Sequence, residues 1–437
     1  MSTESRQHIR WFRNSAPYIN AHRGKTFVLV FGGEAALHPN FANIIHDIAL
    51  LNSLGVRLVL IHGARPQIAE RLQQAGLKAH FHEDVRITDG DALEHVKDAV
   101  GSLRSDIEAR LSMGLPNSPM QGAAIRVCSG NFITAKPIGV VDGVDYQLTG
   151  RVRRVDDRAI SQQLEADSIV LLSPMGYSPT GEIFNLALED IAVHTAAALG
   201  ADKLLLFGAG AGISDASGEL VRQCDLEQAL SLIASGLEGE PARLLATARQ
   251  ACNAGIERCQ IISYVEDCAL LEELFTHDGC GTLVARAGFE QARTATIEDV
   301  GGILELIEPL EQEGILVKRS RELLETEISQ FRVLERDGRI IASAALYPFP
   351  EHRSGELACV VTHPDYRGGD RGQRLLRELV QVARELGLSQ VFVLTTQTAH
   401  WFLEQGFVES TLEALPQEKQ SLYNLQRNSK VFIKPVQ

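Results

Sequence analysis

In the first half of the chain, short apolar runs alternate with helical patterns, and two of these runs end directly at glycines. Thr26–Phe31 is followed by Gly32-Gly33, and Arg57–Ile61 is followed by His62-Gly63. Short apolar runs separated by helices are typical of a mainly parallel sheet that is covered by helices. Ligands of such sheets lie where strand ends meet glycine-rich turns. The pattern therefore predicts an α/β unit with binding sites near these turns.

A second unit is expected after a boundary at about 286–291. Asp337-Gly338 is a strong hairpin signal between two candidate strands, Phe331–Arg336 and Arg339–Leu346. Further candidate strands are Glu356–Thr362, Gln390–Leu394 and Lys430–Lys434. The second unit is therefore predicted to combine hairpin-connected strands with helices.

Two helices are expected in this second unit. Thr296-x-x-Asp299 resembles the N-cap signal of a helix that follows it. Gly301-Gly302 and Pro309 weaken this expectation, because glycine and proline are poor helix formers. Residues 371–387 carry apolar side chains at a spacing close to 3.6 residues, which predicts an amphipathic helix.

Composition and charge exclude several classes of protein. The chain has 42 lysines and arginines against 56 aspartates and glutamates, which gives a formal net charge of −14. This balance argues against a non-specific nucleic-acid binder, which needs a basic face. No uninterrupted apolar stretch of about 18 residues occurs, so no membrane span is expected. The seven cysteines include no Cys-x-x-Cys pair, so a soluble cytoplasmic protein without disulfides or bound metal is predicted.

The segment between the strand ending at Thr362 and the helix starting near residue 371 carries the chemistry of a phosphate-binding turn. It reads Arg367-Gly368-Gly369-Asp370-Arg371-Gly372. Backbone N–H groups at a helix start bind phosphate or pyrophosphate, and nearby arginines add positive charge. Glycines let the backbone approach the ligand closely. The alternative interpretation is a turn that is simply exposed to solvent.

This segment resembles the acetyl-coenzyme A signature of the GNAT acetyltransferases, (Arg/Gln)-x-x-Gly-x-(Gly/Ala), which binds the cofactor pyrophosphate. The resemblance implies that acetyl-CoA contacts Arg367, Gly368, Gly369, Arg371 and Gly372, together with the strand residues Cys359, Val360 and Val361. Asp370 occupies the usual first glycine of the signature, so its side chain must turn away from the phosphates. Trp401–Phe407 resembles a second element of the same superfamily.

The whole C-terminal unit is most similar to the N-acetylglutamate synthases. This similarity is carried by Gly314–Arg321, Glu356–Val360, Val393–Thr396, Trp401–Phe407, Leu415-Pro416, Tyr423 and Arg427–Lys430. The N-terminal unit resembles the amino-acid kinase fold, and acetylglutamate kinases most closely, at Phe31–Gly33, Ile61–Ile68, Leu148–Gly150 and Asn185–Asp190. Those kinases have a lysine where this chain has Val30. Because phosphoryl transfer depends on positioned positive charge, kinase activity is not expected.

The resemblance implies an enzyme that transfers the acetyl group of acetyl-CoA to the α-amine of L-glutamate, the first step of arginine synthesis. Glu356 is implied as the general base that takes a proton from the amine. Arg319 and Arg427 match arginines that hold the two glutamate carboxylates. Many related enzymes protonate the departing thiolate with a tyrosine, but the matching residue here is Phe402, so Thr395 is the candidate donor.

The same resemblance predicts inhibition by L-arginine in the N-terminal unit. The candidate contacts are Tyr18, Glu273 and Gly279, the last two in an expected loop over Glu273–Thr282. Glu273 could pair with the guanidinium of arginine, and Tyr18 could pack on the ligand. The alternative is that these residues are purely structural.

Three domains follow from these expectations. Residues 1–24 form an oligomerisation segment, residues 25–287 a kinase-like regulatory domain, and residues 291–437 a GNAT domain. The first segment carries Trp11, Phe12, Tyr18 and Ile19, for which the sequence offers no obvious core partner. In related arginine-sensitive proteins such a segment joins dimers into hexamers, so a homo-oligomer of this kind is expected.

Two alternatives remain open from the sequence. The first is an amino-acid kinase that uses ATP, against which Val30 argues. The second is a non-catalytic arginine sensor that keeps both folds for binding alone. Glu356 and the phosphate-binding turn argue against the sensor.

Overall fold

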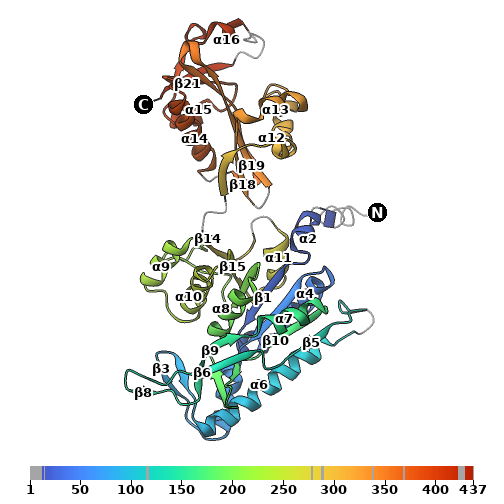
Figure 1. Ribbon diagram of the computed structural model, residues 1–437. Coiled ribbons are helices and arrows are strands. Elements are labelled where there is room, and N and C mark those ends of the chain that lie inside the picture. Colours follow the sequence, from blue (N-terminus) through green and yellow to red (C-terminus); the bar gives the residue numbers. More distant parts are fainter. Residues whose placement is uncertain are drawn as a thin grey trace. The chain divides into compact units, whose positions relative to one another are not determined.

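The computed structural model describes residues 12–13, 15–114, 118–276, 279–286, 290–336, 339–367, 370–421 and 429–436. The chain divides into two compact units, Met1–Ala287 and Gly288–Gln437 (Figure 1). The helices in the described ranges include none that is long and apolar enough to cross a membrane.

The N-terminal unit is built on an eight-stranded sheet. In spatial order its strands are β14 (Gln223–Cys224), β16 (Thr282–Ala285), β15 (Arg258–Ser263), β13 (Lys203–Gly208), β1 (Thr26–Phe31), β2 (Arg57–His62), β10 (Ser168–Leu172) and β5 (Arg126–Cys128). All neighbouring pairs are parallel except β15 with β16. The predicted α/β class is therefore confirmed for this unit.

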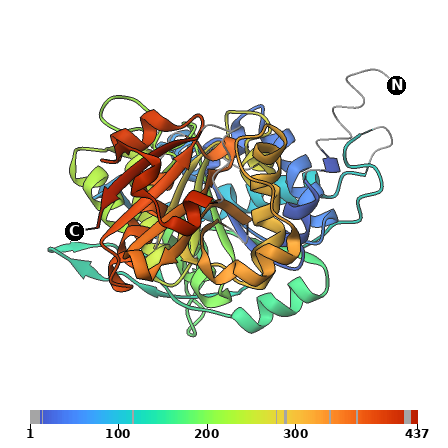
Figure 2. The same cartoon turned by 90° about the horizontal axis from the view of Figure 1, so that it is seen from above.

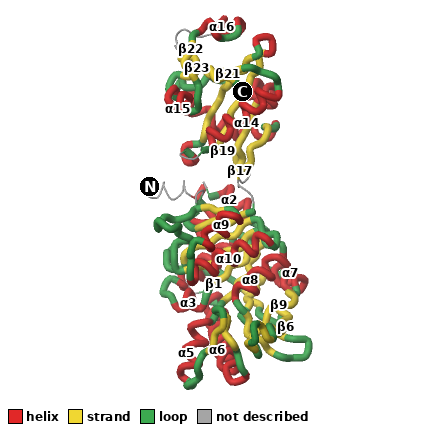
Figure 3. The backbone as a smooth tube through the Cα atoms, turned by 90° about the vertical axis from the view of Figure 1, so that its left-hand side faces the viewer, coloured by secondary structure: helices red, strands yellow, loops and turns green. Residues whose placement is uncertain are grey.

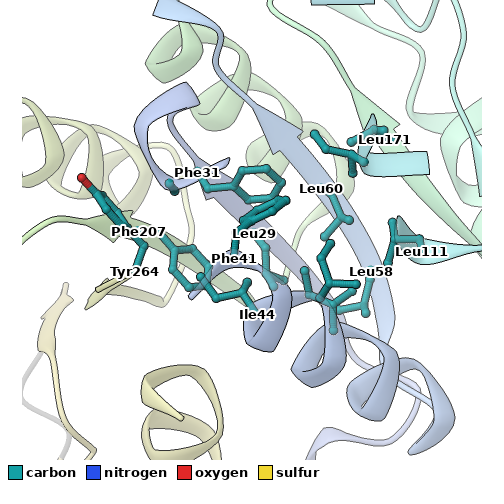
Figure 4. Packing of buried hydrophobic residues seen from close by; sticks show 14 of the residues in the cluster. Leu29, Phe31, Phe41, Ile44, Leu58, Leu60, Leu111, Leu171, Phe207 and Tyr264 are labelled. Atoms are coloured by element: carbon teal, nitrogen blue, oxygen red, sulfur yellow. The ribbon is translucent and has the colours of Figure 1, made fainter. Parts of the chain in front are cut away.

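Helices cover both faces of this sheet, as the alternating core residues require (Figure 1 and Figure 3). Successive strand residues point to opposite faces, so Leu29 belongs to one core and Val30 to the other. On the first face lie α2 (Ala16–His22), α3 (Gly33–Leu37), α4 (Phe41–Ser53), α5 (Arg65–Gln74), α6 (Gly90–Leu111) and α11 (Ala269–Phe275). On the second face lie α7 (Asp157–Glu165), α8 (Leu188–Leu199), α9 (Leu226–Ala234) and α10 (Gly239–Asn253). Figure 4 shows how Leu29 and Phe31 of β1 pack against Phe41 of α4.

Shorter strands complete the N-terminal unit. A small closed barrel contains β6 (Ile133–Pro137), β9 (Thr149–Val155), β11 (Met175–Tyr177) and β12 (Ile183–Leu186). Two hairpins are formed by β3 (His80–His82) with β4 (Val85–Ile87) and by β7 (Val140–Val141) with β8 (Val144–Asp145).

The segment before β1 differs in part from expectation. Tyr18 and Ile19 on α2 pack against the first core of the N-terminal unit, so they do have a core partner. Phe12 is 64% exposed. Trp11 lies outside the described residues. The oligomerising role of residues 1–24 stays a prediction that rests on fewer apolar side chains than the sequence suggested.

The C-terminal unit contains a seven-stranded sheet. In spatial order its strands are β17 (Glu290–Thr294), β18 (Phe331–Arg336), β19 (Arg339–Phe349), β20 (Ser354–Thr362), β21 (Gln390–Thr395), β23 (Lys430–Pro435) and β22 (Val408–Ser410). Neighbours are antiparallel except β20 with β21. The predicted hairpin strands β18 and β19 pair, although Asp337-Gly338 between them lies outside the described residues.

Helices also cover both faces of this second sheet (Figure 1 and Figure 2). One face lies under α12 (Val300–Gln312) and α13 (Arg321–Glu327), and the other under α14 (Arg371–Glu385) and α15 (Ala399–Glu404). The remaining helices are α16 (Gln417–Ser421) and the 3-10 turns η1 (Ile297–Asp299), η2 (Ile328–Gln330), η3 (Pro350–His352), η4 (Pro364–Tyr366) and η5 (Leu412–Ala414).

Helix α12 forms in spite of its glycines and proline. Thr296 and Asp299 make a reciprocal capping box, as the sequence signal predicted. Gly302 packs against β19, where a Cβ would stand 2.9 Å from Ile340 Cγ1. Two glycines and a proline cost about 5 kcal/mol of helix propensity. Burying the four apolar side chains of α12 contributes about 6–12 kcal/mol, so packing decides the outcome; they are Val300, Ile303, Leu306 and Ile307.

We expect acid to destabilise the N-terminal unit through His62, which is fully buried. Its Nδ1–H donates to the Gly63 carbonyl oxygen at 3.2 Å, and its Nε2 accepts from the Ser173 hydroxyl at 2.9 Å. Burial lowers the pKa of His62 from 6.5 to about 4. Between these values the unfolded chain binds more protons than the folded chain. The free energy of unfolding should therefore fall as the pH drops from 6.5 to 4, by up to ~3 kcal/mol at about 1.36 kcal/mol per unit.

His62→Asn removes this titration and keeps a side-chain amide that can donate to Gly63. The urea midpoint of the full chain should vary less with pH between 6.5 and 4 in this variant than in the wild type. Some dependence should persist, because burial also lowers the pKa of His22 to about 4. His80→Asn, at an exposed position of β3, is the control and should keep the wild-type dependence. Equal pH dependence in all three proteins would contradict the prediction.

Candidate functional site

Strands β20 and β21 pair for only part of their length. Their parallel register joins Ser354–Leu357 to Gln390–Val393 and ends there, although β20 continues to Thr362 and β21 to Thr395. Beyond this point the backbone groups of the two strands are not paired with each other. Backbone N–H and C=O groups need partners, and an extended ligand can supply them. The end of the register is therefore the place where this sheet can accept an extended molecule.

A β-bulge lies beside this opening. The register between β19 and β20 shifts so that Cys359 and Val360 together oppose Ala344, and Val361 is again in register with Ser343. Cys359 has the left-handed backbone, with φ +49°, that non-glycine residues rarely adopt. A bulge leaves its extra residue outside the ladder and often serves to direct groups at an active site. The predicted contacts of Cys359 and Val360 with acetyl-CoA are consistent with this geometry.

Glu356 lies one residue before the end of the β20–β21 register. Its neighbour Leu357 packs under α14, so Glu356 points to the opposite face of the sheet. In register it stands beside Tyr347 on β19 and Phe392 on β21. Its Oε2 is 2.6 Å from Nζ of Lys419 on α16, and the Glu356 side chain is 12% exposed. The sequence singled out Glu356 but not Lys419, because nothing local connects residues so distant along the chain.

Arg319 approaches the same face from the segment between α12 and α13. Its guanidinium is 6.0 Å from the centre of the Tyr347 ring. Burial opposes the charge of this side chain, but the facing groups of Cys359, Tyr347 and Glu356 raise its pKa. Arg319 is therefore a charged group close to Glu356. Arg427, its predicted partner in substrate binding, lies outside the described residues.

The phosphate-binding turn leads directly into α14. Asp370 precedes the helix without capping it, and its carboxylate is 3.3 Å from the guanidinium of Arg377. The side chain thus turns away from the helix start, as the sequence required. The N-terminal N–H groups of α14 have no side-chain cap, which leaves them able to bind an anion. Gly368 and Gly369 lie outside the described residues.

The two arginines of this turn differ in their surroundings. Arg371 Nε donates to Glu290 Oε1 at 2.6 Å, and its Nη1 donates to the Tyr366 carbonyl at 3.0 Å. These contacts fix Arg371 beside the helix start. Arg367 is exposed. Both remain predicted contacts of acetyl-CoA, with Arg367 the more exposed of the two.

Thr395 ends β21 on the other side of the opening. Its hydroxyl accepts the Thr398 N–H at 3.1 Å and lies 2.8 Å from the Thr398 hydroxyl. A hydroxyl offers one proton and two acceptor positions, and Thr398 can fill both acceptor positions. The Thr395 proton is then able to serve a ligand, which is what its predicted role as proton donor requires.

Glu273 and Gly279, the predicted arginine contacts, lie next to each other in the N-terminal unit. Glu273 is on helix α11 rather than in a loop, and its Oε2 accepts from the N–H groups of Cys280 at 2.9 Å and Gly281 at 3.0 Å. Gly279 has φ +62°, and a Cβ there would stand 2.4 Å from Glu273 Oε2. Glycine is therefore required at this position.

Lys203 and His22 belong to the same region and were missed from the sequence. Burial lowers the pKa of Lys203 to about 8, with Arg258 acting in the same direction and Glu273 opposing it. The His22 Nε2–H donates to the carbonyl of Leu274 on α11 at 2.7 Å. Lys203 begins an apolar strand, where a lysine usually marks only a solvated strand end. The local sequence therefore gave no sign that this lysine is buried near Glu273.

The kinase-like cavity lies where the glycine-rich turns were predicted to form binding sites. It has a volume of about 320 Å³, and its lining includes Val30, Gly33 and Gly63. Among the described residues this lining contains three arginines and no lysine. Val30 is buried in the second core. Val30 thus lines this cavity at the position where the kinases that the sequence resembles have a lysine.

The two units of the chain match two different protein families. Residues 25–263 match the amino acid kinase family, and residues 302–407 match the acetyltransferase (GNAT) family. The amino-acid acetyltransferase of Ectopseudomonas mendocina (strain ymp) is 59% identical over 430 residues, which cover 98% of this chain and 99% of the relative. The amino-acid acetyltransferase of Pseudomonas aeruginosa (strain LESB58) is 58% identical over 427 residues, with the same coverage.

Two solved structures of one related enzyme match this chain over nearly its whole length. N-acetylglutamate synthase from Neisseria gonorrhoeae, complexed with coenzyme A and L-arginine, is 37% identical and superimposes with a TM-score of 0.90. The match covers 98% of this chain and 99% of that one. The same enzyme complexed with coenzyme A and N-acetyl-glutamate gives a TM-score of 0.63.

Gly372→Val should weaken the binding of acetyl-CoA. A Cβ at Gly372 would lie 3.2 Å from Trp401 Cζ2, so a branched side chain must displace the turn or the ring. Such overpacking costs about 1–3 kcal/mol, and a loss of ~1.4 kcal/mol in binding raises the KM for acetyl-CoA roughly tenfold. Steady-state kinetics with each substrate varied in turn measures this. Gly301→Val on α12, where a Cβ meets nothing within 4 Å, is the control. An unchanged KM for acetyl-CoA in Gly372→Val would contradict the prediction.

Proposed function

The chain belongs to the amino-acid acetyltransferases, and we propose that its acceptor is L-glutamate, which it converts with acetyl-CoA into N-acetyl-L-glutamate and CoA. The observation that carries the proposal is the placement of Glu356, at the end of the β20–β21 register and close to Arg319. An amino acid with two carboxylates needs cations for both and a base for its ammonium. The similar synthase from Neisseria gonorrhoeae was crystallised with N-acetyl-glutamate. Acetyl-CoA is the co-substrate, and the opening, the bulge and the uncapped start of α14 fit an extended thioester with a pyrophosphate.

The proposed reaction moves two protons and one acyl group. Glu356 accepts the first proton from the α-ammonium of glutamate, directly or through one water. The freed amine attacks the thioester carbonyl, whose oxygen is stabilised by backbone N–H at Cys359 or Val360. The C–N bond forms and the C–S bond breaks. Thr395 gives its hydroxyl proton to the departing thiolate and regains a proton from the nitrogen, which loses its second proton as it becomes the amide. No covalent enzyme intermediate is needed, because the two substrates are held together.

Arg319 and Arg427 are proposed to hold the two carboxylates of glutamate. A guanidinium matches a carboxylate with two parallel N–H donors, which fixes orientation as well as charge. The charged state of Arg319 beside Glu356 supports its part in this proposal. Neither a kinase nor a non-catalytic sensor accounts for a base, a bulge and an anion site gathered on one sheet.

Glu356→Gln keeps the shape of the side chain and removes its basicity. A positioned base contributes about 10²–10⁴-fold, so kcat should fall by at least ~10²-fold while the affinity for acetyl-CoA is retained. The measurement is thiol release from acetyl-CoA with and without L-glutamate. Glu409→Gln, in an exposed ion pair with Lys430, is the matched control and should keep wild-type kcat. Retention of more than roughly a third of wild-type kcat between pH 6 and 9 would refute the base assignment.

We also propose that L-arginine inhibits the enzyme by binding beside Glu273. This carboxylate is the acidic group that could meet a guanidinium, and burial raises its pKa, which makes a cationic partner favourable. Gly279 lets the backbone pass close to the Glu273 carboxylate, because a Cβ there would stand 2.4 Å from Oε2. The structure of the similar synthase with coenzyme A and L-arginine supports an arginine site in this family. Tyr18 on α2 is the proposed packing partner.

Glu273→Gln should raise the arginine concentration that halves activity by at least about tenfold, since a charge-assisted pair contributes about 1.5–3 kcal/mol. Each variant is compared with its own activity in the absence of arginine. Glu272→Gln, on the exposed side of the same helix, should keep the wild-type response. If the wild-type enzyme is unaffected by millimolar arginine, or if both variants respond alike, the site is assigned wrongly.

A further inference from the structure

The ion pair between Lys419 and Glu356 has no part in the reaction described above. Lys419 Nζ is 2.6 Å from Glu356 Oε2, and the two side chains are 24% and 12% exposed. Exposed ion pairs contribute little, but a sheltered carboxylate that loses its cation is left with an uncompensated charge. This pair therefore has the surroundings in which one partner controls the direction of the other.

The fold places Lys419 above Glu356 through a small core of its own. Phe392, the register neighbour of Glu356 on β21, packs with Leu415 and Val431. This contact holds the segment before α16 against the face of the sheet to which Glu356 points. The side-chain amide of Gln420 donates to the Leu415 carbonyl at 2.7 Å and ties α16 to the same segment. Lys419 thus reaches Glu356 from an anchored backbone.

The other ionisable groups around Glu356 come from β19, β20, α12, α13 and the segment between these two helices. Arg319 comes from the segment between α12 and α13, and Tyr347 stands beside Glu356 on β19. Cys359 lies on the same strand as Glu356. Two carboxylates, Glu311 and Glu327, are occupied by the Arg319 backbone N–H at 2.9 Å and the Tyr347 hydroxyl at 2.8 Å. Within the described ranges, Lys419 is the cation in ion-pair contact with Glu356.

We propose that Lys419 is a positioning residue for the acetyl transfer, because its ammonium directs the Glu356 carboxylate at the sheet face where the substrate amine binds. The inference rests on the proposed role of Glu356 as the base. Lys419 neither gives nor takes a proton in the reaction. Its contact with Oε2 restricts the directions that the Glu356 side chain can adopt before the substrate arrives.

Lys419→Met keeps most of the length of the side chain and removes its charge. The kcat/KM for glutamate should then fall by about tenfold, since a misplaced catalytic group costs up to ~10²-fold. The KM for acetyl-CoA should remain at its wild-type value. Lys419→Arg keeps the charge and should restore most of the wild-type kcat/KM.

Lys434→Met is the matched control for losing a lysine from this unit. The Lys434 ammonium donates to the Gln405 carbonyl at 2.6 Å and lies 5.7 Å from the centre of the Phe407 ring. This variant should change stability alone and keep the wild-type kcat/KM for glutamate. If Lys419→Met behaves in the same way, with lower stability and an unchanged kcat/KM, Lys419 is a structural residue and the proposal is wrong.

The double variant Lys419→Met with Glu356→Gln separates this proposal from the role of Glu356 itself. If Lys419 acts through Glu356, adding Lys419→Met to Glu356→Gln should cause no further loss of kcat. A further tenfold loss would show that Lys419 acts on substrate directly and would overturn the proposal. An active Glu356→Gln enzyme would instead overturn the base assignment. An inactive Glu356→Gln enzyme together with a wild-type kcat/KM for glutamate in Lys419→Met would leave the base assignment standing and remove only the inference about Lys419.

Discussion

The acetyltransferase site depends on the point at which two parallel strands stop pairing. After Leu357 on β20 and Val393 on β21, the backbone groups of the two strands no longer satisfy one another. Such groups are costly to bury without partners, so the sheet must either be wet or be completed by a ligand. The bulge at Cys359 adds to this, because it takes one more residue out of the ladder on the β19 side. The end of the β20–β21 register thus provides the opening, and the bulge beside it provides unpaired backbone donors.

The charges of the site follow from what covers the sheet at this interruption. Glu356 is a sheltered carboxylate, and two segments from different parts of the chain bring cations to it, Arg319 before α13 and Lys419 on α16. Lys419 contacts this carboxylate and Arg319 lies close to it, so the proposed base and one of the proposed carboxylate-binding arginines are neighbours on one face of the sheet. The two parts of the proposed reaction, proton transfer and binding of the acceptor, therefore depend on the same covering segments.

The sequence was sufficient for the elements whose signals are local. The apolar runs predicted β1, β2 and β20, and the resemblance placed the turn before α14, because each depends on neighbouring residues. The Lys419–Glu356 pair and the proximity of Lys203 to Glu273 were not predictable, since they depend on how distant segments pack. Helix α12 was doubted for its glycines, yet the contact of Gly302 with Ile340 shows that glycine serves packing there. The sequence offered no core partner for Tyr18, because the residues that it packs against lie on elements distant along the chain.

The N-terminal unit combines a cavity at its glycine-rich turns with a core that Val30 helps to fill. Val30 is 4% exposed and packs in the second core, where burial of an apolar side chain contributes about 1.5–3 kcal/mol. Val30, Gly33 and Gly63 also line the cavity. Lys203 lies at the start of β13, whereas Val30 lies near the end of the parallel neighbour β1, so the two regions lie at opposite ends of these strands. The proposed arginine site beside Glu273 is therefore separate from the cavity, and its geometry does not depend on what the cavity binds.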